Sequence, residues 1–164
     1  REAYAMPRAS KAKERAEKGA AFEERIAGWL KRTFGFEVNL RELARGKISK
    51  RPYEVDIHAI ATVKRLLRTT RIHIWIECKT TKVKRTDVVK LLESARDVRA
   101  AWEDGIEEWS PDMLDIVSES DFDIDDNLRA NENKVYCILA KPRRYQFVGD
   151  MSREDFQSFV SSEY

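Results

Sequence analysis

The stretch Ile72–Lys79 constrains the fold of this chain more than any other segment. Three isoleucines alternate with His73 and Trp75, which is the period-two pattern of a β-strand rich in β-branched residues. Glu77 and Lys79 follow at the end of this strand and point to the same face, because they are two residues apart. A charge at the end of a buried strand costs free energy unless it is paired, hydrated or bound to a metal. The pattern therefore predicts a functional site at this strand end.

A second strand, Tyr53–Val63, is predicted just upstream and carries Asp56 in an otherwise apolar run. If the two strands form an antiparallel hairpin with its turn near Leu66 and Leu67, the numbers of facing residues sum to roughly 133. That register places Asp56 opposite Glu77. Two carboxylates and a lysine are then expected on one patch.

Length and composition predict one globular domain without a membrane span. The chain has 164 residues, of which 42% are hydrophobic and 37% charged, and a chain of this size can bury roughly two-thirds of its unfolded surface. Cys78 and Cys137 lie in apolar runs, which predicts reduced, buried thiols and a cytoplasmic setting. No apolar run is long enough to cross a membrane, and the N-terminus lacks the apolar core of a signal peptide. The absence of an initiating Met suggests a fragment of a longer protein with additional domains.

Charge is distributed unevenly along the chain. Residues 103–132 hold twelve Asp and Glu and one Arg, so the other 134 residues hold 30 Lys and Arg against 17 Asp and Glu, a net charge of +13. A basic body favours a polyanionic partner. Charge counts alone leave open the alternative that these side chains only solvate the surface.

Periodicity predicts helices before and after the hairpin. The first runs from Ser10, as its cap, to about Thr33 and ends at Gly35. Its expected inner face is Phe22, Ile26, Trp29, Leu30 and Thr33. The second is capped by Thr86, with Asp87 in its first turn, and ends near Gly105. Its expected inner face is Val88, Leu91, Leu92, Ala95, Val98 and Trp102.

The remaining elements are shorter. A strand is predicted over 36–40 and a basic loop over 41–52. Ser110 and Pro111 have the pattern of a helix start, which predicts a short helix to about Val117, followed by a loop over 118–133. Strands over 134–140 and 145–148 precede a last helix that opens at Ser152, with Phe156, Phe159 and Val160 inside. This order predicts a mixed sheet with helices on both faces.

Three motifs together resemble those of a known family. They are Gly19–Glu23 (GAAFE) on the first helix, Val55–Ile57 (VDI) on the strand, and Ile76–Lys79 (IECK) on the next strand. This pattern resembles the PD-(D/E)XK nuclease superfamily, nearest to the Mrr-like restriction endonucleases and the Holliday junction resolvase-like nucleases. The resemblance covers roughly residues 19–100 and, more weakly, 134–140. Two departures are the lack of a proline before Asp56 and an acidic insert at 103–133.

The resemblance implies an α/β restriction-endonuclease-like fold, in which a mixed β-sheet is flanked by helices on both faces around an αβββαβ core. We expect residues 1–18 to form an N-terminal lead-in and the start of the first helix. Residues 19–164 are then a nuclease-like domain with the acidic insert 103–133.

The predicted catalytic residues are Asp56, Glu77, Lys79 and Glu23. Carboxylates suit Mg²⁺ or Mn²⁺, and Asp56 and Glu77 can supply two ligands. The resemblance implies the backbone carbonyl of Cys78 as a further ligand, and Glu23 as the holder of a metal-bound water or a second ion. Lys79 is expected to position the attacking water and to stabilise charge at phosphorus.

The sequence thus predicts an Mg²⁺-dependent endonuclease that hydrolyses DNA phosphodiester bonds, of the restriction or defence type. Basic residues on either side of the site are expected to contact DNA phosphates, namely Lys64, Arg65 and Arg68 at the hairpin tip and Lys82, Lys84 and Arg85 after the site. A Holliday-junction-type resolvase, which requires a homodimer, is one alternative. A non-catalytic DNA-binding or assembly module is another.

The individual residues also have structural interpretations. Asp56 and Glu77 could form an ion pair with Lys79 across the hairpin, and Glu23 could be a solvated helix residue. His58 and His73 fit sheet positions better than a zinc site, and Cys78 is predicted on the opposite face from His73. The acidic segment is expected either as a docked cap remote from the metal, or as a guard that lies over the basic groove.

Overall fold

The computed structural model describes residues 7–162, so the first six residues of the predicted lead-in lie outside the described range. The elements in this range are α1 (Arg8–Phe34), β1 (Glu37–Ala44), β2 (Tyr53–Arg65), β3 (Arg68–Lys79), α2 (Arg85–Glu103), β4 (Met113–Ser118), α3 (Ile124–Glu132), β5 (Val135–Lys141), β6 (Arg144–Val148) and α4 (Arg153–Val160). They form an α/β fold with one six-stranded mixed sheet.

The strands follow one another across the sheet in chain order, from β1 to β6. The pairs β1–β2, β2–β3 and β5–β6 are antiparallel, whereas β3–β4 and β4–β5 are parallel. Each parallel pair is joined by a helical crossover, α2 or α3, because parallel neighbours need a long connection.

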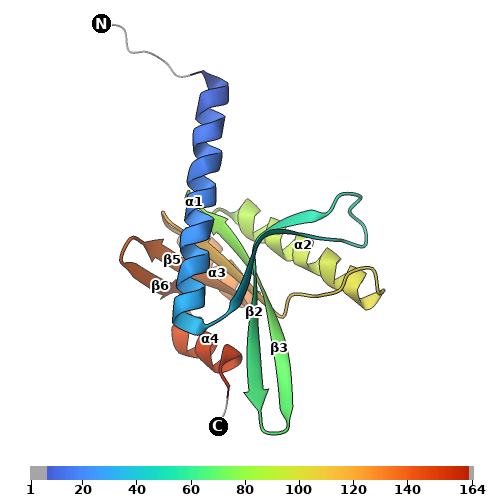
Figure 1. The fold of residues 1–164 in the computed structure, drawn as a ribbon. Coiled ribbons are helices and arrows are strands. Elements are labelled where there is room, and N and C mark those ends of the chain that lie inside the picture. The colour runs from blue at the N-terminus through green and yellow to red at the C-terminus, as the bar shows by residue number, and fades with distance from the viewer. Residues whose placement is uncertain (1–6, 163–164) are drawn as a thin grey trace, which may run out of the picture.

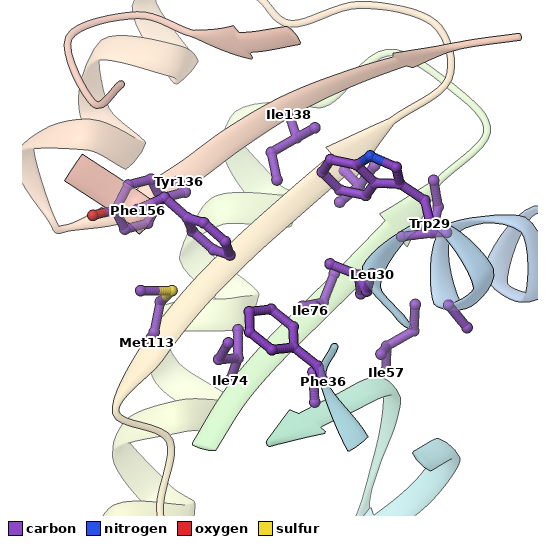
Figure 2. Packing of buried hydrophobic residues seen from close by; sticks show 14 of the residues in the cluster. Trp29, Leu30, Phe36, Ile57, Ile74, Ile76, Met113, Tyr136, Ile138 and Phe156 are labelled. Atoms are coloured by element: carbon purple, nitrogen blue, oxygen red, sulfur yellow. The ribbon is translucent and has the colours of Figure 1, made fainter. Parts of the chain in front are cut away.

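Helices cover both faces of the sheet, as the sequence predicts (Figure 1). One buried cluster lies between the sheet and α1 with α4. Figure 2 shows it, with Leu30 of α1 beside Ile76 of β3, and Phe156 of α4 beside Tyr136 of β5. The second cluster lies between the other face and α2 with α3, around Trp75 and Trp109.

Helix α1 differs from its prediction at its start. It begins after Pro7, so Ser10 is an exposed residue inside the helix and not its cap. Gly35 ends it with φ of +71°, as expected for a left-handed C-cap. Thr33 is exposed and does not join the predicted inner face. Although α1 has 27 residues, no helix in the described part of the chain is both long and apolar enough to cross a bilayer.

Helix α2 begins earlier than predicted. Lys84, not Thr86, is its N-cap residue, and Asp87 accepts a hydrogen bond from the Lys84 backbone N–H at 2.9 Å. A carboxylate on the third helical residue closes this turn as well as a capping hydroxyl, which explains the shift. Trp102, predicted on the inner face of this helix, is 49% exposed and lies in its last turn. Phe159, predicted on the inner face of α4, is also exposed.

The predicted hairpin register is confirmed. Ile57 faces Ile76 and Arg65 faces Arg68, and the two residue numbers of each pair sum to 133. Leu66 and Leu67 form the turn, and both are almost fully exposed.

The predicted helix over 110–117 is wrong, because this segment forms β4. Each residue from Met113 to Ser118 is buried and pairs with β3, and five of them also pair with β5. Asp112 exchanges hydrogen bonds with the backbone of His73 and so begins the strand ladder instead of a helix. Backbone pairing on both sides outweighs the local Ser-Pro start signal.

The predicted loop over 118–133 is also wrong, since it contains α3. Its buried residues are Asn127, Ala130 and Asn131, which give no apolar stripe for a sequence pattern to show. The two asparagines donate to the carbonyls of Val148 and Val135. The acidic segment is therefore part of the sheet and of its helical cover. Residues 113–132 are therefore not an insert without regular structure.

Asp115 of β4 is a fully buried carboxyl without a partner. It is 0% exposed, and neither side-chain oxygen accepts a hydrogen bond within the described residues. Burial raises its pKa well above the usual 3.8, because an apolar environment disfavours the ionised form. An unpaired polar group in an apolar core costs about 1–3 kcal/mol on protein mutational scales.

We predict that Asp115→Val raises the free energy of unfolding by about 1–3 kcal/mol at pH 7, because it removes this unpaired group. The gain should be larger at pH 8 than at pH 5. A raised folded-state pKa gives stability that is complete below about pH 3.8 and is lost as the pH rises. Urea denaturation at both pH values measures it, with the exposed Asp125→Val as control. A destabilised Asp115→Val variant would contradict this interpretation.

Candidate active site

A cleft of about 340 Å³ lies against α2, where β2 begins and β3 ends. Its walls carry Asp56, Glu77 and Lys79, which the sequence predicts as site residues, together with Lys90 of α2. The hairpin therefore brings these three residues together as predicted.

Strand alternation directs Glu77 and Lys79 into the cleft. Ile74 and Ile76 are fully buried in the cluster under α1. Trp75 belongs to the cluster under α2, and the residues two and four positions later line the cleft on the same side. This is the shared face expected of residues two apart on a strand.

Asp56 lies at an irregularity in β2. Val55 packs in the cluster under α2 and Ile57 in the cluster under α1, although residues two apart on a regular strand share a face. Among the described residues, Asp56 has no partner in the β1–β2 ladder, and Arg41, its expected neighbour, has φ of +51°. A left-handed backbone at a non-glycine residue is strained, and such strain concentrates at functional sites.

The two central carboxyls lie in the cleft wall without counter-ions. Asp56 Oδ2 accepts a hydrogen bond from the Cys78 backbone N–H at 2.9 Å, and Glu77 Oε1 accepts one from Trp75 Nε1 at 3.1 Å. Neither carboxyl forms an ion pair with a residue in the described range 7–162. The predicted alternative of a structural ion pair with Lys79 is therefore wrong.

Burial perturbs both groups, and the charge of Glu77 adds to the shift of Asp56. Burial, followed by the nearby Glu77 charge, raises the pKa of Asp56 to about 7. Burial also raises the pKa of Glu77, although hydrogen bonds with Trp75 and Asp56 and the charges of Lys90 and Lys79 oppose the shift. A carboxyl that holds its proton near neutrality, in a cleft and beside a second carboxyl, is characteristic of functional sites.

Lys79 is tethered to the start of α2. Its Nζ lies 3.2 Å from Asp87 Oδ1, while the other Asp87 oxygen accepts from the Lys84 backbone. The first turn of α2 thus holds the lysine at the cleft edge, with about a third of its side chain exposed.

Glu23 comes from α1 and is bonded to Arg41. Its Oε2 lies 2.7 Å from Arg41 Nη1. Burial and then the charge of Asp56 raise the pKa of Glu23, which shows that it lies within electrostatic range of the cleft. The structure therefore places Glu23 next to the site, but with an arginine as its partner.

The predicted metal ligands include only two side chains that would bind the ion directly, Asp56 and Glu77. Among residues 7–162, no group of three or more Asp, Glu, His or Cys side chains is arranged to hold a metal ion. Asp56 and Glu77 remain as a pair of adjacent carboxyls. Burial raises the pKa of the Cys78 thiol well above its usual value, which leaves that thiol neutral and a poor nucleophile.

The predicted DNA contacts divide into two groups. Lys64, Arg65 and Arg68 lie at the hairpin tip, eight or more residues along the strand from Asp56, or about 26 Å at the usual rise per residue. The Arg65 side chain donates hydrogen bonds to backbone carbonyls of α4, and the Lys64 backbone N–H donates one to Ser162 Oγ. The prediction that the tip flanks the site is therefore wrong, because the strands run away from it.

Lys82, Lys84 and Arg85 lie in the segment that leaves β3 directly after the site. Lys82 Nζ lies 3.2 Å from Asp123 on the exposed surface. Exposed ion pairs are weak, so this contact leaves the lysine available to a competing anion.

The two histidines form a polar link across three strands. His58 Nδ1 lies 3.1 Å from Glu42 and His58 Nε2 lies 2.8 Å from His73 Nδ1. Trp109 stacks on His58 at 3.7 Å, which settles its place in the core. Burial lowers the pKa of both histidines. They are sheet residues, as the sequence analysis favours.

Sequence reasoning missed Arg41, Lys90 and the tethering role of Asp87. The spacing of Asp87, Lys90, Leu91 and Ser94 is helical and could have placed them on one cleft-facing side of α2. The left-handed conformation of Arg41 has no sequence signal, because glycine, asparagine or aspartate would be the usual residue there.

Comparisons with protein-family models, with curated proteins and with solved structures give no match to this chain.

We predict that Asp56→Asn is more stable than the parent at pH 8, in EDTA, by a few kcal/mol. The folded-state pKa is raised from 3.8 to about 7, so this carboxyl favours folding below about pH 4 and loses that contribution as the pH rises to 7. Asparagine keeps an oxygen for the Cys78 N–H. Urea denaturation between pH 4 and pH 8 tests it, and equal pH dependence in both proteins would show that Asp56 is not perturbed.

Proposed function

We propose that this protein is a metal-dependent phosphodiesterase that cuts DNA, with a restriction-endonuclease-like arrangement of its site. The observation that carries the proposal is the pair Asp56 and Glu77, two desolvated carboxyls side by side with no counter-ion in the described structure. Proteins retain so unfavourable a pair where a cation or a proton transfer uses it.

The pair fits an ion of the Mg²⁺ type. Such ions keep several waters and are commonly bound through one or two carboxylates plus substrate phosphate. Asp56 and Glu77 would hold the ion, and the resemblance adds the Cys78 carbonyl. When bound, a divalent ion supplies positive charge to a phosphate oxygen and lowers the pKa of a water.

The other residues of the site have distinct roles in this proposal. Lys79 supplies a fixed positive charge at the cleft edge, where it can orient a water and stabilise charge on a phosphate oxygen. Asp87 is a positioning residue, because it holds Lys79 by the ion pair at 3.2 Å. Glu23 is held by Arg41 at 2.7 Å, outside the cleft lining.

A second candidate is a non-catalytic DNA-binding module with the same fold. The lack of a preformed group of three metal ligands among the described residues favours it. Both candidates suit a reducing compartment, since Cys78 and Cys137 are free thiols, and we place the protein in the cytoplasm.

The decisive experiment incubates the protein with supercoiled, linear, single-stranded and four-way-junction DNA, in Mg²⁺, Mn²⁺ or EDTA. Cleavage that requires a divalent ion supports the nuclease. Binding without cleavage under all these conditions supports the module. Preferential cleavage of the junction would identify a resolvase.

Asp56→Ala and Glu77→Ala should each abolish Mn²⁺ binding, measured by calorimetry, and also DNA cleavage. Each removes one of two anionic ligands from a site with few protein ligands. Binding should strengthen in the parent as the pH rises through 7, because Asp56 must lose its proton to bind the ion. Glu24→Ala, an exposed change on α1, is the control. Unchanged metal affinity in both site variants would show that Asp56 and Glu77 are not metal ligands.

Lys79→Ala should retain metal and DNA binding but lose about 10²–10³ in cleavage rate, the usual effect of removing one preorganised charge. Asp87→Ala should cause a smaller loss, since it releases Lys79 without removing it. Single-turnover cleavage measures both, with the exposed Lys31→Ala as control. If Lys79→Ala cuts at the parent rate, the lysine is only structural.

A further inference from the structure

The N-terminal half of α1 projects beyond the sheet into solvent. Every residue from Arg8 to Lys18 is exposed, whereas the buried residues of this helix begin at Phe22. Residues 8–21 extend about 21 Å at 1.5 Å per residue. Figure 1 shows this half of α1 standing free of the sheet, pointing away from the hairpin tip.

The projection starts at the candidate active site. Glu23 Oε2 lies 2.7 Å from Nη1 of Arg41, the expected neighbour of Asp56 in the β1–β2 register, while the other end of α1 at Thr33 and Phe34 lies beside Thr62. The helix axis therefore runs along β2 from Thr62 towards Asp56. Its N-terminal half continues in the same direction, past the strand ends that carry the cleft.

The projecting helix carries a basic stripe, defined as Arg8, Lys11, Arg15 and Lys18. These residues follow one another at three- and four-residue steps, so they lie on one face of the helix. The same steps continue through Phe22 to Ile26 and Trp29, which pack on the sheet. The stripe is thus the prolongation of the sheet-facing side, and it faces the space beyond the sheet end.

The stripe residues are not engaged elsewhere. Within the described residues, none of the four forms an ion pair or a side-chain hydrogen bond. Lys13 and Glu17 lie on another side of the helix, 4.0 Å apart. Glu14 is the acidic residue that borders the stripe. A helix segment that is polar on all sides and has no packing partner obtains no stability from burial of an apolar face.

We propose that the basic stripe of α1 binds the phosphate backbone of the nucleic acid that enters the cleft. Over ten residues it spans about 15 Å, and duplex DNA carries one charge per about 1.7 Å of axis. The stripe is therefore long enough to lie beside several phosphates. The inference rests on the proposed function for the identity of the polyanion, and it adds a surface outside the cleft that the DNA must cross.

The test compares binding of a fluorescent 20-base-pair duplex at several salt concentrations, in EDTA so that no cleavage occurs. The variant replaces all four stripe residues by Gln, which removes charge and keeps helix propensity. We expect the slope of log affinity against log salt to fall by roughly 0.9 for each lost contact. Circular dichroism checks that the helix is retained.

Matched controls separate position from charge. Lys11→Gln should reduce the slope by about 0.9, whereas Lys13→Gln, two residues away on another side, should leave it unchanged. Lys64→Gln with Arg68→Gln, at the far hairpin tip, should also leave it unchanged. Equal effects of Lys11→Gln and Lys13→Gln would show that only general surface charge matters, and would overturn the proposal.

Other outcomes separate this inference from the proposed function. A quadruple variant with the parent's slope overturns the stripe, even if the parent cleaves DNA. Loss of self-association in that variant, seen by sedimentation with an unchanged slope, would assign the stripe to a protein contact instead. A normal slope loss in a protein that never cleaves DNA supports the stripe and overturns the nuclease.

Discussion

The pairing of β3 with both its neighbours determines most of this structure. β3 is antiparallel to β2 on one side and parallel to β4 on the other. The first pairing brings Asp56 into the neighbourhood of Glu77. The second forces a crossover, which α2 provides, and so places Asp87 and Lys90 over the same strand end. The cleft exists because one strand has two kinds of neighbour.

The site at this strand end conflicts with the stability of the fold around it. Burial disfavours the ionised carboxyls of Asp56 and Glu77, and Arg41 is held in a left-handed conformation beside them. The hairpin and its apolar neighbours supply enough packing to hold this arrangement. Asp115 is another buried carboxyl that costs stability, but it is fully enclosed in the core and does not line the cleft.

The charge counts along the sequence suggest an acidic insert and a basic body, but the structure distributes these charges differently. The acidic segment supplies a central strand and a covering helix, and two of its carboxylates contact the basic loop before β2, Asp104 at Lys47 and Glu107 at the Arg45 backbone. The positive charges are dispersed, and only some lie near the cleft. The hairpin tip points away from it, while the basic stripe of α1 projects past it. Position along the elements, and not net charge, therefore decides which basic residues can serve the site.

The sequence by itself determined the hairpin, its register and the meeting of Asp56, Glu77 and Lys79. These depend on local alternation and a short turn, which are visible in consecutive residues. The tertiary structure decided β4, where strand pairing on both sides outweighed the Ser110–Pro111 helix signal. It also decided α3, whose buried face is made of asparagines and alanine, and the partners of Lys79 and Glu23. Those partners come from elements far apart in the chain, and no local pattern encodes which of them meet.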